Sequence, residues 1–116
     1  MTRLVHEESG RALADRIEKA RTPFERMKGL LGRAGLEPGG GMWIERCGSI
    51  HTCFMRFPID VVFADADMIV RKAARRVAPW RMRCARGARH VFELPAGALD
   101  ACPVAAGDRL RVEEAE

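Results

Sequence analysis

A short apolar stretch of the sequence, SIHTCFMRFPID, carries three side chains whose types can do chemistry: His51, Cys53 and Asp60. A thiolate nucleophile needs a nearby base and a carboxylate that orients this base. If the stretch is an extended strand, His51 and Cys53 share one face, opposite Ile50 and Thr52. Side chains two residues apart then stand about 7 Å from each other, which is longer than a hydrogen bond. The stretch is therefore either a reaction centre or a polar seam satisfied within the fold.

Two acidic residues lie inside apolar segments, where a carboxylate needs a partner. Asp60 precedes the run VVF, and Glu93 lies between Phe92 and Leu94. A buried carboxylate without a partner costs several kcal/mol, so each is expected either to hold the structure together or to contact a ligand. If their strands are neighbours, the two carboxylates could also serve acid–base chemistry as a pair.

The favoured hypothesis is a small non-catalytic or accessory binding domain, with a cleft beside HTCFM and RFPID for a small molecule or a peptide. Its candidate ligand-binding residues are Arg33, His51, Thr52, Met55 and Asp60. The alternative is a small hydrolase-like enzyme, whose candidate catalytic residues are His51, Cys53, Asp60 and Glu93. The sequence therefore does not decide whether the protein is an enzyme, although it favours a non-catalytic protein.

The four cysteines, at positions 47, 53, 84 and 102, lack the paired C-x2-C spacing of structural zinc sites. Cys47, His51 and Cys53 together with an acid are suitable ligand types for zinc, but no recognised spacing supports the set. We therefore predict no metal and no cofactor. In a reducing compartment the cysteines are expected to be free thiols.

The formal net charge of +4 is unevenly distributed. One stretch holds eight cations and no Asp or Glu: Arg71, Lys72, Arg75, Arg76, Arg81, Arg83, Arg86 and Arg89. Such clustering can attract phosphates, so electrostatic nucleic-acid binding through residues 71–89 is a further alternative. Single-strand binders also need stacking aromatics, and only Trp80 lies among these arginines. A solvated face is the favoured interpretation of the stretch.

One helix is predicted near the start of the chain, over TPFERMKGLLGR. Thr22 is a suitable N-cap, Pro23 suits the first helical position and Glu25 completes a capping box. The apolar residues that follow recur at helical spacing: Phe24, Met27, Leu30 and Leu31. The preceding segment RALADRIEKA suits a helix or a strand equally well.

The rest of the chain reads as short strands. Strands are predicted after the glycines of EPGGGMWIERCG, in SIHTCFM, in IDVVFA, in MIVRKAARRV and in ARHVFELPAG. DVVFADADMIV is a predicted hairpin, GALDACP a single helical turn, and AAGDRLRVEE a tight turn into a last strand. This pattern indicates an α+β, mostly-β domain: a small curled sheet or partly closed β-barrel with one or two short helices.

The chain of 116 residues has the length of one domain. We assign residues 1–10 to a flexible N-terminus and residues 11–116 to a single domain. No apolar run near the start is long enough for a signal peptide or a membrane span, so a cytoplasmic location and no membrane partner are expected. The oligomeric state is not predicted.

Five motifs follow one another over about residues 20 to 112: RMKGLLGR, GGGMWI, FPIDVVFAD, VFELPAG and AAGDRL. In these motifs the sequence resembles domain-of-unknown-function family 192 (DUF192), small bacterial and archaeal proteins. The resemblance implies a compact β-rich, barrel-like fold with one or two short helices and no established activity.

The chain also departs from this family in two places. It has HTCFM at residues 51–55, where many members carry Trp-Met-Lys-Asn-Thr, and Gly-Leu-Leu at residues 29–31, where they usually carry Gly-Leu-Met. Nothing about the first segment is therefore carried over from other members.

Overall fold

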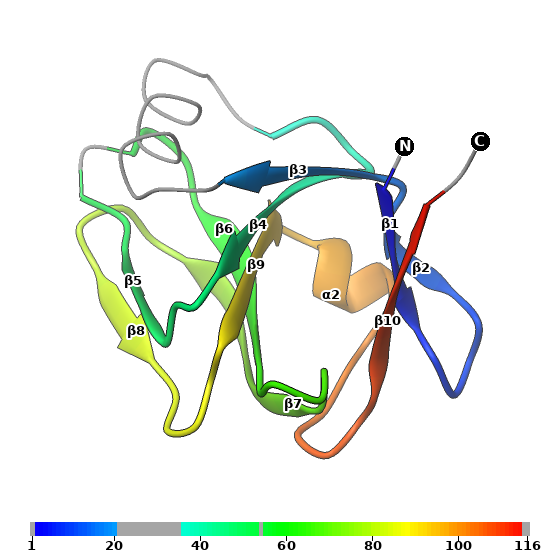
Figure 1. Cartoon of the computed structure of the whole chain (residues 1–116). Coiled ribbons are helices and arrows are strands. Elements are labelled where there is room, and N and C mark those ends of the chain that lie inside the picture. The colour runs from blue at the N-terminus through cyan, green and yellow to red at the C-terminus, as the bar shows by residue number, and fades with distance from the viewer. Residues whose placement is uncertain (1, 21–35, 54, 115–116) are drawn as a thin grey trace.

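The computed structural model describes residues 2–20, 36–53 and 55–114, which form a mostly-β fold (Figure 1). The helix predicted over residues 22–33 lies outside the described residues. In chain order the described elements are β1 (Thr2–His6), β2 (Ala12–Ala14), β3 (Arg16–Ala20), β4 (Gly40–Glu45), β5 (Ser49–His51), β6 (Ile59–Ala64), β7 (Val70–Val77), β8 (Met82–Cys84), β9 (His90–Pro95), α2 (Ala98–Ala101) and β10 (Leu110–Glu114).

The described strands form three sheets. The central sheet has the order β3-β4-β9-β6-β7, a second sheet has the order β10-β1-β2, and β5 pairs with β8 alone. None of these sheets closes into a barrel. The predicted fold class, mostly-β α+β, is confirmed.

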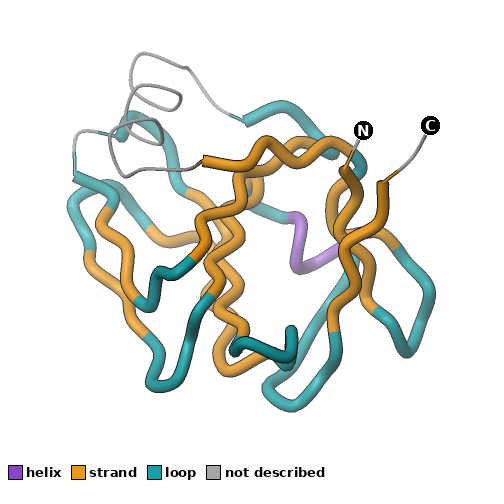
Figure 2. Tube along the Cα trace, viewed as in Figure 1, coloured by secondary structure: helices purple, strands orange, loops and turns teal. Residues whose placement is uncertain are grey.

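Two hydrophobic cores cover the two faces of the central sheet. Strand β6 is buried at every position, and its side chains alternate between the faces. One face, here called the helix-side core, packs against α2 and the β10-β1-β2 sheet; its members include Leu4, Val62, Phe92, Leu94 and Leu99. The other face, here called the β5-side core, includes Met42, Ile50, Met55, Phe57, Val61, Phe63 and Val91. Figure 2 shows the short helix between the central sheet and the strands β1 and β10.

Several elements predicted from local pattern are confirmed. Strands β6 and β7 form the predicted antiparallel hairpin, and β4 begins within the run of glycines. Strand β9 ends at Pro95, whose ring removes the donor that a continuing ladder would need. The single helical turn appears as α2, and the last strand as β10.

The long strand predicted over residues 49–55 is wrong beyond His51, where β5 ends. The carbonyl of Thr52 accepts backbone hydrogen bonds from Met55 at 3.2 Å and from Trp80 at 3.0 Å. These bonds replace a continuing ladder with a turn. Period-two alternation therefore does not run from Ile50 through to β6.

The ambiguous segment of residues 11–20 forms two strands and no helix. Leu13 of β2 and Ile17 of β3 both turn toward the core, with Asp15 at the corner between the strands. Strand β3 lies parallel to β4, with Ile17 opposite Gly41. The segment that we assigned to a flexible N-terminus holds β1, which pairs with β10 along its whole length.

His90 and Trp43 predict a pH dependence of stability. The Nε1–H of Trp43 donates to Nδ1 of His90 at 3.0 Å, which requires an unprotonated Nδ1. Burial lowers the pKa of His90 below its usual 6.5, although the charges of Glu45 and Asp65 oppose this. Below about pH 6.5 the unfolded chain therefore takes up a proton more readily than the folded chain, and stability should fall as the pH drops toward the lowered pKa.

Urea unfolding of the wild type and of His90→Gln, at pH 7.5 and 5.5, measures this effect. Glutamine can still accept the indole N–H but does not titrate. We expect the wild type to lose more stability than the variant on acidification. Equal losses would show that His90 does not contribute.

Candidate functional site

Asp60 on β6 is fully buried, and both of its carboxylate oxygens accept hydrogen bonds. Oδ1 accepts the backbone N–H of Arg76 at 2.8 Å. Oδ2 accepts the backbone N–H groups of Gly97 at 3.1 Å and of Leu99 at 2.9 Å. Asp60 therefore ties β6 to β7 and to the first turn of α2, the structural role that the sequence had left as one of two.

The α2 turn needs this help because it has no side-chain cap of its own. Its N-cap position is Gly97, at φ 98°, a left-handed conformation that glycine adopts at little cost. Helix N-termini are usually capped by a local Ser, Thr, Asp or Asn side chain. Here the carboxylate of Asp60, from the distant strand β6, accepts the backbone N–H groups of Gly97 and Leu99 instead.

Asp60 and Glu93 lie on neighbouring strands but project from opposite faces of the central sheet. The register pairs Asp60 with Leu94 and Glu93 with Val61. Directly opposed residues of an antiparallel pair share a face. Leu94 belongs to the helix-side core and Val61 to the β5-side core. The structure therefore does not bring the two carboxylates together as an acid–base pair.

Glu93 is buried on the face that the β5 segment covers. It lies opposite Met42 on β4, and Met42 packs in the same core as Ile50 and Phe57. Of the two predicted carboxylates, Glu93 therefore shares a side of the sheet with Ile50, Met55 and Phe57, and Asp60 does not. A hydrolase-like arrangement would have to use Glu93.

His51 and Cys53 are both half-buried, at the end of β5 and in the turn that follows. Ile50 packs in the β5-side core and pairs with Arg83, whereas His51 pairs with Met82 at the end of β5, and the Nδ1 atom of its ring is buried. Met55 is buried in the β5-side core. Arg33, the remaining predicted ligand contact, lies outside the described residues.

Thr52 is completely buried, and its side chain bonds to the backbone. Its hydroxyl donates to the carbonyl of Ala78 at 2.6 Å and accepts the backbone N–H of Arg81 at 2.8 Å. Its own backbone N–H donates to the carbonyl of Arg81 at 2.8 Å. Thr52 thus fastens the chain between β7 and β8 to the end of β5.

A pocket of about 410 Å³ lies between β2 and α2, on the helix side of the central sheet. It is lined by residues 11–13, 38–39, 95–98 and 101–102. Small-molecule sites are typically concave, mostly apolar and of about 300–1,000 Å³. No local pattern in the sequence indicates this pocket, although PAG in the motif VFELPAG forms part of its wall.

Two side chains of this pocket can influence a ligand. The guanidinium of Arg11 is exposed and donates to the carbonyl of Ala101, so it is held at the rim. Cys102 is buried, and burial raises the pKa of its thiol although Arg11 opposes this shift. The thiol is therefore protonated at neutral pH, and a protonated thiol is a poor nucleophile.

The cysteine-based metal set considered from the sequence is not assembled among the described residues. Cys47 donates its thiol hydrogen to the carbonyl of Ser49 at 2.8 Å. Potential ligand atoms instead converge at His6, Glu8 and Asp108, within 4.8 Å of one another. Backbone donation from Ala105, followed by the bond to His6, lowers the pKa of Asp108. These hydrogen bonds explain this second group as a junction between β1 and the turn before β10.

The chain matches the model of an uncharacterized protein family over residues 4–112. This chain belongs to the DUF192 family. The match covers the central sheet, the pocket and parts of both terminal strands, and it confirms the resemblance carried by the five motifs.

Relatives of this DUF192 chain share its fold over nearly its whole length. A UPF0127 protein of Thermococcus sibiricus is 30% identical over 122 residues, covering 97% of this chain and 76% of the relative. A crystal structure from Sinorhizobium meliloti 1021, described as a candidate transcription regulator, has a TM-score of 0.79 at 28% identity and covers 96% of this chain and 91% of its own. A Novosphingobium aromaticivorans protein of unknown function also has a TM-score of 0.79, at 25% identity, with coverages of 95% and 82%.

No catalytic activity follows from these relatives. Within the described part of the chain, no helix has the length and apolar character needed to span a bilayer. The cytoplasmic location expected from the sequence stays a prediction.

Proposed function

We propose that this DUF192 chain is a small non-catalytic binding domain. Its ligand would be a small molecule, or a peptide side chain, whose apolar part enters the pocket between β2 and α2. The observation that carries the proposal is the pocket itself: about 410 Å³, formed by three separate segments of chain. A ligand of this size would bury most of its surface there.

Of the described residues predicted to bind a ligand, none lines this pocket, but Asp60 holds part of its wall. Its carboxylate holds the backbone of Gly97 and Leu99 from behind, and Gly97 lines the pocket. Because both carboxylate oxygens already accept backbone hydrogen bonds, Asp60 would position the pocket wall rather than touch the ligand. A wall fixed in this way is preorganised for binding.

The donors and charges at the pocket suit recognition better than catalysis. Arg11 supplies one cation at the rim, which would favour a ligand carrying an anionic group beside its apolar part. Cys102 is the thiol in the lining, and its raised pKa keeps it protonated. The hydrolase-like alternative has less support, because Asp60 projects into the helix-side core, away from β5.

A fragment screen followed by ¹H–¹⁵N NMR tests the proposal. We expect fragments with one carboxylate and an apolar ring to bind with a Kd of about 1 mM or tighter, shifting the amide signals of Gly39, Gly97 and Ala98. Ala101→Trp, which would fill the pocket from an exposed position, should weaken binding at least about tenfold. Ala106→Trp, at an exposed alanine outside the lining, is the matched control.

The proposal fails if no fragment shifts these amides, or if the hits bind Ala101→Trp as tightly as Ala106→Trp. Arg11→Ala separates the two parts of the ligand. It should weaken carboxylate fragments and leave neutral fragments of the same shape unchanged.

A further inference from the structure

The cationic stretch of residues 71–89 divides into a first half whose arginines form ion pairs with aspartates and a second half whose arginines form none with the described residues. Arg75 and Arg76 on β7 both pair with Asp100, and Arg71 lies 3.9 Å from Asp65. Among the described residues, by contrast, no ion pair involves the arginines that follow: Arg81, Arg83, Arg86 and Arg89. The sequence alone treats all of these cations alike, but the structure pairs Arg71, Arg75 and Arg76 with carboxylates, and it pairs neither Lys72 nor the later arginines with a described carboxylate.

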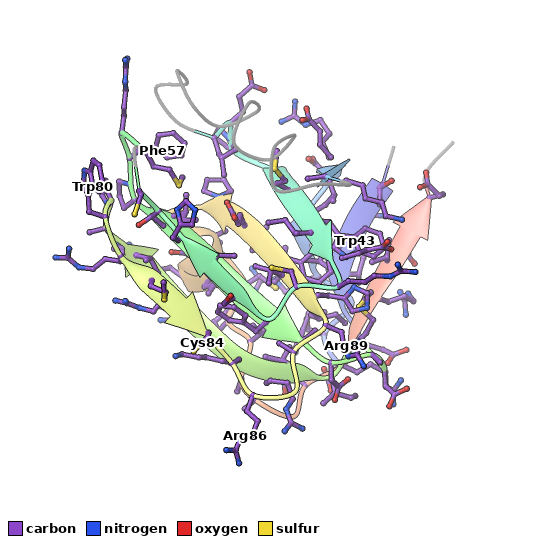
Figure 3. All side chains as sticks on the ribbon, turned by 60° about the vertical axis from the view of Figure 1, so that its left-hand side comes forward. Trp43, Phe57, Trp80, Cys84, Arg86 and Arg89 are labelled. Carbon is purple, nitrogen blue, oxygen red and sulfur yellow. The ribbon has the colours of Figure 1, made fainter. Side chains whose placement is uncertain are left out.

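The arginines of this second half gather at the end of the molecule built by the β5-β8 pair. Arg83 lies on β8, and Arg86 and Arg89 follow it in the loop to β9. The backbone carbonyl of Arg89 accepts the N–H of Cys47, which brings this loop against the β4–β5 connection and exposed Arg46. Figure 3 shows Trp80 at one end of β8 and Arg86 beyond its other end, with Cys84 between them.

Large exposed apolar side chains occur at the same place. Among the described residues, two large hydrophobic side chains are exposed, Trp80 at 58% and Met82 at 71%. Trp80 also has a positive φ of 64°, which is costly for a bulky residue and is maintained by its backbone bond to Thr52 at 3.0 Å. The backbone of Trp80 is strained, and its indole is exposed to solvent among guanidinium groups that form no ion pair with the described residues. This combination is unusual for a surface that only contacts water.

We propose that the β8 face, defined by the exposed residues Trp80, Arg81, Met82 and Arg86, binds single-stranded nucleic acid. The guanidinium groups would contact phosphates, and the indole of Trp80 would stack on one unpaired base, with Met82 beside it. Arginine binds phosphate in a planar fork and also stacks on bases, and Lys72 reaches the same strand, where its ammonium donates to the carbonyl of Cys84 at 3.2 Å. Bases stack on aromatic rings only when the strand is unpaired.

This site is independent of the proposed pocket. The pocket lies on the helix side of the central sheet, whereas the β5-β8 pair packs on the other side through Ile50. Loss of one activity would therefore leave the other intact, and the two proposals can fail separately.

The chain offers its own fluorescent reporter for the test. It has two tryptophans, and Trp43 is stacked on Phe92 with ring centroids 5.7 Å apart. In a Trp43→Phe background, Trp80 is the single fluorophore. We expect dT12 and rU12 oligonucleotides to quench its emission, with the logarithm of the binding constant falling linearly with the logarithm of salt concentration. Tighter binding of one oligonucleotide would identify DNA or RNA as the ligand.

Matched variants separate stacking from charge. Trp80→Ala, followed by the anisotropy of labelled oligonucleotides, should weaken binding roughly 5- to 100-fold with little change in the salt slope. Arg81→Ala with Arg86→Ala should reduce the salt slope by about 0.7 for each phosphate that the protein no longer neutralises. The control pair Arg109→Ala with Arg111→Ala removes two arginines that pair with Glu7 at the other sheet and should leave binding unchanged.

Three results would overturn the proposal. One is the absence of any quenching at 50 mM salt. Another is equal binding of Trp80→Ala and of its parent. The last is a poly-glutamate peptide that quenches Trp80 as strongly as dT12 and rU12, which would assign the face to an acidic protein partner.

Discussion

Replacing Asp60 with alanine should lower the free energy of unfolding by roughly 3–5 kcal/mol, because a buried donor left without an acceptor costs about 1–3 kcal/mol. The substitution removes the acceptor of three backbone N–H groups, those of Arg76, Gly97 and Leu99. Since small domains unfold with only about 5–15 kcal/mol, this is a large share of the total. Urea unfolding followed by circular dichroism measures the loss. Faster hydrogen exchange at Gly97 and Leu99 would locate it at the α2 turn.

Two further variants identify the cause of this effect. Asp60→Asn keeps one acceptor oxygen but turns an NH2 group toward a donor, so we expect an intermediate loss of about 2 kcal/mol. Asp67→Ala removes an exposed aspartate in the β6–β7 turn and should stay within about 0.5 kcal/mol of the wild type. If Asp60→Ala were as stable as Asp67→Ala, the carboxylate would not hold β6, β7 and α2 together.

Thr52→Val should cost roughly 2–3 kcal/mol although it preserves the shape of the side chain, because it leaves two partly buried backbone groups without their hydrogen-bond partner. The lost hydroxyl donates to the carbonyl of Ala78 and accepts the N–H of Arg81. Unlike Asp60→Ala, this change acts on the β5-β8 pair. We therefore expect hydrogen exchange to accelerate first at residues 49–52 and 80–84, before the central sheet opens.

Thr52→Ser is the matched control for this prediction. It keeps the hydroxyl and removes one methyl group, so it should lose about 1 kcal/mol, the value of a buried methyl or methylene group. A Thr52→Val protein as stable as Thr52→Ser would mean that packing, and not the two hydrogen bonds, fastens the Trp80 segment to β5.

Part of the candidate site could be predicted from the sequence. The two acidic residues in apolar runs were expected to be buried, and Asp60 and Glu93 are both completely buried. The relation between them was not predictable, because it depends on the register that places Val61 opposite Glu93. Thr52 was predicted as a ligand contact, but its hydroxyl is occupied by backbone partners 26 and 29 residues away.

The pocket, too, could not be predicted from the sequence. Its walls come from segments around residues 12, 38 and 97, and no local pattern connects them. Glycine itself indicates unusual backbone angles, and two glycines of the lining, Gly39 in the triple-glycine run and Gly97, have positive φ. The sequence also could not predict which arginines lack an ion pair. Arg75 and Arg76 pair with Asp100, which lies about 25 residues further along the chain.

By itself, the sequence determined the elements whose cause is local. These are the buried run of β6, its hairpin with β7, the stop of β9 at Pro95 and the single turn of α2. Only the tertiary structure decided which face each polar side chain occupies, which donors Asp60 satisfies 37 and 39 residues away, and which arginines form ion pairs. The reason is that propensity and turn chemistry act between near neighbours, whereas the burial of a charge and its partner depend on registers set by the packing of the whole chain.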